Sequence, residues 1–155
     1  MSVKSKTAIE HFYSGLNCAQ SVFLTYANEL SIDRETALKI ASGFGAGMGR
    51  EQETCGAVSG AVMVLGLMNT VPGRTLNENK EASYAAVSGF INSFRDQFGS
   101  VLCRDILDGC DLKTEEGQQQ FKEQELLDKR CVHCVKLAIN LLENLSQKQQ
   151  VKHVQ

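Results

Sequence analysis

The sequence contains no tryptophan, a single proline and only three histidines among its 155 residues. The histidines, His11, His133 and His153, are too few and too scattered to form a histidine metal site. The most apolar run, residues 57–71, is shorter than the ~20 residues of a membrane-spanning helix, so we expect no stable membrane insertion. No apolar stretch of the kind found in secretory signals follows the N-terminus, which predicts a cytoplasmic location. A net charge of −2 argues against nucleic acid as a main partner.

The sequence nevertheless contains six cysteines, a high number for a soluble domain of this size. A chain of this length buries roughly 70% of its unfolded surface and needs no disulfides for stability. In the cytoplasm thiols are kept reduced, so cysteines there more often bind metals, catalyse reactions or sense redox state. The six are Cys18, Cys55, Cys103, Cys110, Cys131 and Cys134.

The pattern of the chain is helical nearly throughout. Strand-like alternation is missing, while Ala, Leu, Glu, Lys and Gln are abundant. This predicts an all-α fold, a single-domain bundle of about five to seven helices over residues 1–146, with a polar C-terminal tail at 147–155. Small residues in the apolar helix at 55–69 would allow close helix approach. Capping residues are expected at Asn17, at Ser31 or Asp33, and at Thr54, Ser100 and Thr114.

A glycine-rich segment interrupts this helical pattern between residues 43 and 50. Four glycines in seven residues do not form a helix interior, since each costs ~1 kcal/mol there, so we expect a tight interhelix loop. As a phosphate cradle it lacks a preceding strand and the Lys-Ser/Thr pair. Its backbone amides are suited to approach sulfur, and a flexible connection is the alternative. The candidate cofactor-binding glycines are Gly43, Gly45, Gly47, Gly49 and Gly56.

Four cysteines share one context, because Cys18, Cys55, Cys103 and Cys131 all lie in the first turns of predicted helices. A helix N-terminus carries about half a positive charge, which lowers the pKa of a thiol and favours thiolate. Four such placements predict that the helix ends converge on a shared sulfur site. Packing as small buried hydrophobes is the alternative.

Cys131 and Cys134 form a Cys-x-x-Cys motif on the last predicted helix, with both sulfurs on one face. Such a motif serves dithiol redox chemistry or half of a tetrahedral metal site. No second Cys-x-x-Cys completes a zinc ribbon. Val135 stands where a c-type haem attachment site needs histidine. The two thiols are therefore candidate redox residues.

Several segments together form a recognisable set of motifs. They are Asn17-Cys18-Ala19-Gln20, Gly43-Phe44-Gly45-Ala46-Gly47-Met48, Cys55-Gly56-Ala57-Val58-Ser59-Gly60 with Met63 and Gly66-Leu67, Phe98-Gly99-Ser100, Cys103-Arg104 and Cys131 followed by Val135 and Ala138. This set resembles the C-GCAxxG-C-C family of redox-active proteins.

The resemblance covers almost the whole chain and implies a small bacterial or archaeal protein with four shared cysteines, here Cys18, Cys55, Cys103 and Cys131. Cys110 and Cys134 stand where the family has aromatic residues. Related split-Soret cytochromes bind haem, but the chain lacks their haem attachment sequence, so no haem is expected.

The leading hypothesis is that Cys18, Cys55, Cys103 and Cys131 ligate an iron–sulfur cluster or act as a redox thiol set in electron transfer. One alternative is a metal-free thiol–disulfide oxidoreductase with Cys131 as nucleophile and Cys134 or Cys110 as resolving thiol. Another is a structural or regulatory domain stabilised by zinc. The expected partner is a redox protein of unknown identity, and the apolar helix at 55–69 would also suit a homodimer.

Overall fold

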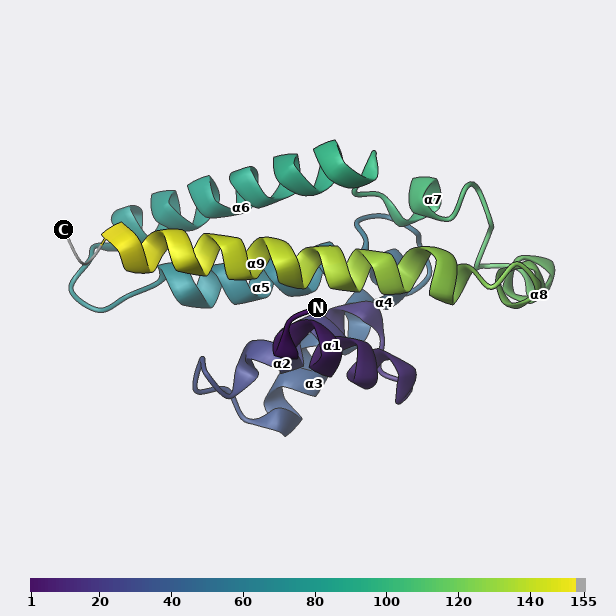
Figure 1. Ribbon diagram of the computed structural model, residues 1–155, viewed down its shortest axis with the longest axis horizontal. Helices are drawn as coiled ribbons and strands as arrows, with labels where there is room; N and C mark the ends of the chain where they lie inside the picture. The colour runs from purple at the N-terminus through teal and green to yellow at the C-terminus, as the bar shows by residue number, and fades with distance from the viewer. Residues whose placement is uncertain (153–155) are drawn as a thin grey trace.

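The structure is a computed structural model that describes the backbone of residues 1–152 and side chains through Gln147. It confirms the all-α prediction, since these residues contain helices and no strand (Figure 1). There are more helical segments than expected because short turns surround the longer helices. The segments are α1 (Val3–Tyr13), α2 (Cys18–Ala27), α3 (Arg34–Ala41), η1 (Ser42–Phe44), α4 (Gly45–Met48), α5 (Gly56–Asn69), α6 (Leu76–Phe98), α7 (Cys103–Ile106), α8 (Glu115–Glu123), η2 (Leu127–Cys131) and α9 (Val132–Lys152).

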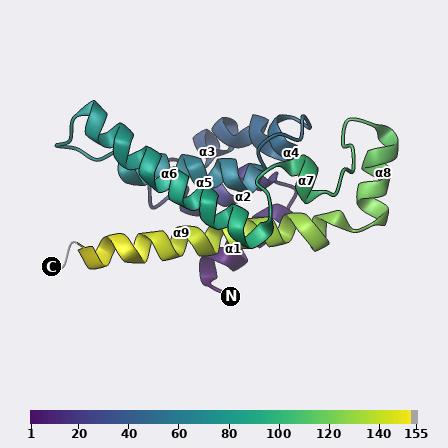
Figure 2. The ribbon, with the colours of Figure 1, turned by 90° about the horizontal axis from the view of Figure 1, so that it is seen from above.

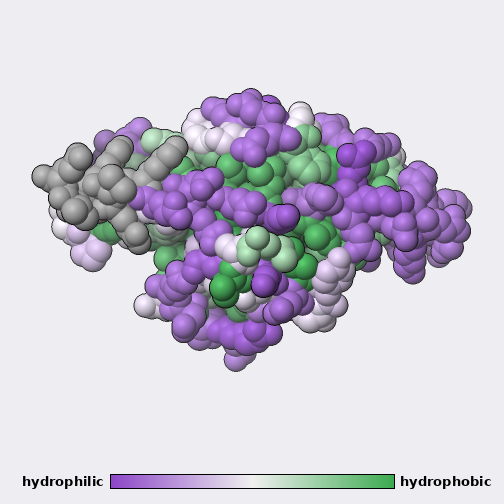
Figure 3. Space-filling view, viewed as in Figure 1, coloured by the Kyte–Doolittle hydropathy of each residue, from purple (hydrophilic) through white to green (hydrophobic). Residues whose placement is uncertain are grey.

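The core lies where α2, α5, α6 and α9 pack together, and α8 extends from one end of the molecule (Figures 1 and 2). Phe23, Phe90 and Phe94 are among the largest fully buried side chains. Helices α2 and α5 approach closely at Gly60, where an added Cβ would lie 2.7 Å from the Ala19 carbonyl oxygen. This agrees with the close approach predicted from small residues. Polar side chains dominate the face drawn in Figure 3, with apolar atoms visible between the helices.

Three predicted caps are present. Asn17 forms a capping box with Gln20 at the start of α2, Asp33 rather than Ser31 caps α3, and Thr114 caps α8. Each side chain accepts a backbone N–H that the first helical turn leaves without a partner.

The predictions that Thr54 and Ser100 cap helices are wrong, because the backbone next to both residues forms a short pairing between two distant segments. Thr54 forms an isolated antiparallel bridge with Leu102. The Cys55 amide donates to the Val101 carbonyl at 2.8 Å, and the Cys103 amide donates to the Glu53 carbonyl at 2.7 Å. This short backbone pairing brings the starts of α5 and α7 together, so it also brings Cys55 close to Cys103.

The glycine-rich segment is a left-handed turn rather than a simple loop. All five residues from Ala46 to Arg50 have positive φ, between +53° and +69°. The Gly49 amide donates to the Gly45 carbonyl at 2.9 Å, which closes one turn of helix. For Ala46, Met48 and Arg50 this conformation costs roughly 1–2 kcal/mol each, because the Cβ crowds the following carbonyl. Backbone strain of this kind clusters at functional sites.

The chain enters α9 through η2, a π-helical turn at Leu127–Cys131. Helix α9 then continues to Lys152, so the predicted polar tail begins inside this helix, and positions 153–155 lie outside the described residues. No helix among the described residues is both long enough and apolar enough to cross a membrane.

Candidate functional site

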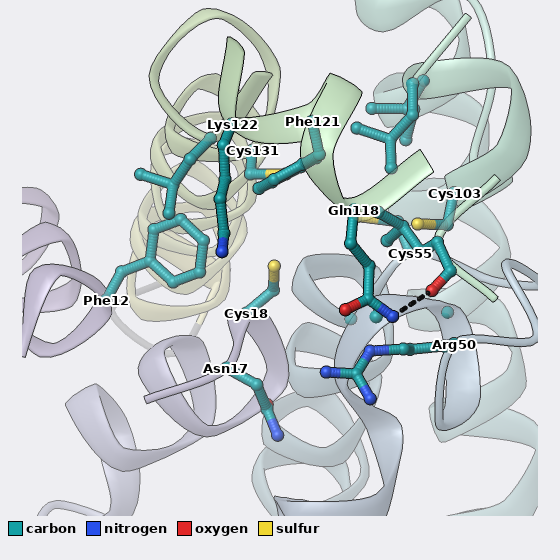
Figure 4. A pocket seen from close by; sticks show the side chains of 17 residues that line it. Phe12, Asn17, Cys18, Arg50, Cys55, Cys103, Gln118, Phe121, Lys122 and Cys131 are labelled. Carbon is teal, nitrogen blue, oxygen red and sulfur yellow. Dashed lines mark hydrogen bonds between the residues drawn. The ribbon is translucent and has the colours of Figure 1, made fainter. Parts of the chain in front are cut away.

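Four cysteines that are far apart in the sequence line one cavity of about 290 Å³ (Figure 4). Cys18 is the first residue of α2, Cys55 immediately precedes α5, Cys103 begins α7, and Cys131 ends η2. The first three are 9%, 5% and 6% exposed, and Cys131 is half-buried. The structure therefore gathers the four candidate metal ligands, Cys18, Cys55, Cys103 and Cys131, around one space.

The neighbouring Cys131 thiol, followed by burial, raises the pKa of Cys18 well above its usual value. Burial also raises the pKa of Cys103 to about 12. The expectation that helix starts favour thiolate is wrong for these two residues when no metal is bound. Helix α7 has only four residues, so its dipole is too small to offset the rise in pKa that burial causes at Cys103.

The pKa of Cys55 is lowered, first by the neighbouring Cys134 thiol and then by the backbone amides of Ala57 and Val58. Only the second cause is the one that the helix-start argument predicts. Burial opposes this lowering, and the Cys55 thiol in turn raises the pKa of Cys134. The amides found next to sulfur thus belong to the start of α5.

The two cysteines of the Cys-x-x-Cys motif lie next to different cysteines. Cys131 is the neighbouring thiol that most affects the pKa of Cys18, whereas Cys55 is the one that most affects the pKa of Cys134. Cys134 is fully buried and does not line the cavity. The candidate redox thiols Cys131 and Cys134 therefore each face a thiol on another helix.

Cys110 lies apart from the four-cysteine cavity. It is 1% exposed, and its thiol donates to the Gly117 carbonyl at 3.1 Å. The buried side chain of Gln52 holds the surrounding loop, because it donates to the Cys110 carbonyl at 2.7 Å and accepts from the Leu112 amide at 2.9 Å. Nothing in the sequence around Gln52 signals this role.

We predict that Gln52→Ala lowers the free energy of unfolding by about 2–4 kcal/mol, because a buried carbonyl and a buried amide lose their partners. Chemical denaturation measures this value. The matched control is Gln119→Ala on the exposed face of α8, which should change stability by less than about 0.5 kcal/mol. Equal effects of the two substitutions would show that Gln52 does not hold the loop.

The five candidate glycines occupy different places. Gly47 and Gly56 line the cavity, whereas Gly43, Gly45 and Gly49 do not. A Cβ on Gly56 would lie 3.1 Å from the Cys18 Cβ, and a Cβ on Gly47 would lie 2.7 Å from the Cys103 Cβ. These two glycines allow backbone to approach the cysteines closely.

Apolar and cationic side chains complete the cavity, and sequence reasoning missed them. Phe12 comes from α1, Arg50 from the left-handed turn, and Gln118, Phe121 and Lys122 from α8 (Figure 4). The sequence of α8 is polar with a single aromatic residue, so no pattern marks it as the cover of a site. Only the fold brings it over the cysteines.

Ligand spacing suited to a single metal ion is not found in the part of the chain that the structure describes. No three or more Cys, His, Asp or Glu side chains there are grouped so that they could hold one ion. The four cysteine thiols surround a space instead.

Comparison with known proteins identifies the family. The family model described as "Putative redox-active protein (C_GCAxxG_C_C)" matches residues 16–145, so the chain belongs to this family of redox-active proteins. The matched region contains all six cysteines and every lining residue of the cavity except Phe12. No curated protein and no solved structure matches the chain significantly.

Proposed function

We propose that the protein transfers electrons through an iron–sulfur cluster held by Cys18, Cys55, Cys103 and Cys131. The observation that carries this proposal is that these four thiols, from four separate segments, line one cavity. Four cysteine thiolates are the usual ligands of two-iron and four-iron clusters, and a bound cluster supplies one-electron transfer.

The cavity between the four cysteines favours a cluster over a single zinc ion. A zinc ion held by four thiolates at ~2.3 Å needs all four sulfurs packed tightly around one point. The described residues contain no such group, whereas the cavity of about 290 Å³ between the cysteines has room for a cluster. A zinc-stabilised structural domain is therefore the weaker candidate, and a melting temperature that falls when a chelator is added would support it.

The surroundings of the thiols also suit a redox centre. Three of the four cysteines are less than a tenth exposed, so their thiols are largely shielded from solvent. The amides of Ala57 and Val58 donate to Cys55, and the thiol of Cys134 lies next to it. Hydrogen bonds to sulfur and low solvent exposure are the means by which proteins set cluster potentials.

Iron and acid-labile sulfide analysis of the anaerobically purified chain tests the proposal. We expect iron and sulfide in equal amounts, with visible absorption that bleaches when dithionite is added. A colourless chain that still lacks iron after reconstitution would contradict the proposal.

Metal-free thiol–disulfide exchange is the second candidate, and the two pairs of neighbouring thiols favour it. In the structure Cys131 faces Cys18 and Cys134 faces Cys55, so exchange would use these cross-helix pairs rather than Cys131 with Cys134 or Cys110. Disulfide mapping after mild oxidation distinguishes the pairings. If no disulfide forms and a single-cysteine variant traps no partner protein, this candidate fails.

We also propose, from the sequence, a redox protein as the physiological partner and the cytoplasm as the location. A homodimer belongs to the same set of expectations, although the structure buries the most apolar side chains of α5 in the core. Size measurement in solution and cross-linking of single-cysteine variants test these points.

A further inference from the structure

The charged side chains that line the four-cysteine cavity are all positive. Arg50 and Lys122 are the charged residues that line it, and no Asp or Glu lines it among the described residues. The Lys122 side chain extends into the cavity on the side of Phe12 and Cys18, and Arg50 extends from the left-handed turn on the side of Gln118 (Figure 4). The net charge of the whole chain is −2, so the charge of the cavity lining is opposite in sign to that of the protein.

The two lining cations differ from other cations near the site. Arg104 pairs with Glu53 at 2.5 Å, Lys113 pairs with Glu51, and Arg130 pairs with Asp108. Arg50 and Lys122 form no ion pair with any carboxylate that the structure describes. Their charge is thus available to a molecule that enters the cavity.

The rest of the lining is apolar, with aromatic rings from Phe12 and Phe121 and aliphatic side chains such as Ile106 and Leu112. Small-molecule sites combine an apolar wall with a few polar groups that fix the orientation of the ligand.

We propose that this cavity binds a small organic anion with an apolar body, its negative group between Arg50 and Lys122 and its body toward the cysteines. The inference deepens the proposed function, on which it rests, by naming the class of molecule that the redox site receives. Helix α8 supplies both Lys122 and Phe121, so it contributes to charge recognition as well as to the apolar wall.

The test uses two fluorescent probes of the same shape, anilinonaphthalene sulfonate and the uncharged N-phenyl-naphthylamine, with the anaerobically purified full chain. We expect the anionic probe to bind more tightly than the neutral one. Arg50→Gln and Lys122→Gln should each weaken binding of the anion by about three- to tenfold, as expected for the loss of one exposed charge contact, and leave the neutral probe unchanged.

The matched control is Arg74→Gln, which removes the same charge in the turn before α6, at the opposite end of the molecule (Figure 1). It should leave both probes unchanged. After the metal has been removed, the anionic probe should also slow the alkylation of Cys131 by iodoacetamide, which places it in this cavity. Equal binding of the two probes, no binding of either, or no effect of the Arg50 and Lys122 substitutions would overturn the inference. Iron and sulfide measured on the same preparation decide the proposed function separately.

Discussion

Serine in place of Cys18, Cys55, Cys103 or Cys131 is expected to remove most of the iron that the chain retains after anaerobic purification. A serine hydroxyl is a harder ligand than a thiol and is far less readily deprotonated, so it holds iron poorly. Each of the four cysteines lines the same cavity, so the four variants should lose iron to a similar extent. Iron and sulfide content per chain measures the effect.

Cys110→Ser and Cys134→Ser are the matched controls, because neither thiol lines the cavity. Cys110→Ser should keep its iron. Cys134→Ser should also keep it, with a changed reduction potential because the group next to Cys55 is altered. If Cys134→Ser loses iron as completely as Cys55→Ser, the four-cysteine assignment is wrong.

The second large effect is expected at Gly47. An alanine Cβ there would lie 2.6 Å from the Gln52 Cα and 2.7 Å from the Cys103 Cβ, closer than real Cβ contacts. Overpacking of this kind costs about 1–3 kcal/mol, and the positive φ of +67° adds about 1 kcal/mol. Gly47→Ala should therefore lower the free energy of unfolding by about 3 kcal/mol, measured by denaturation of the metal-free chain.

Gly49→Ala separates the two contributions. Gly49 has a similar φ of +62°, but a Cβ there would have open space around it. It should cost only the conformational part, about 1 kcal/mol, and leave iron binding intact. If both alanine variants lose the same stability, the close approach of the turn to Cys103 is not what requires glycine.

Much of the fold could be predicted because local rules and tertiary structure agree there. Asn17 and Thr114 cap helices as their side-chain chemistry predicts, and small residues in α5 allow close packing on α2. The gathering of the four cysteines was also expected, since all four lie in the first turns of predicted helices. The lowered pKa of Cys55 was expected only in part, since the Cys134 thiol is its first cause and the amides at the start of α5 come after it.

The remaining features depend on contacts between distant segments. A left-handed turn through Ala46, Met48 and Arg50 opposes the local preference of each residue, so only the surrounding structure can impose it. The contact between Cys55 and Cys134 joins α5 to α9 across the core. Lys122 and Phe121 reach the cavity because the loop held by Gln52 directs α8 over it, and no short-range pattern encodes that placement.

X-ray absorption at the iron and zinc edges of the anaerobically purified chain tests the central claim most directly. The account predicts an iron signal with sulfur neighbours and a second iron nearby, and predicts that the signal is lost in Cys55→Ser but kept in Cys110→Ser. A chain that contains only zinc, or no metal after reconstitution, would contradict it.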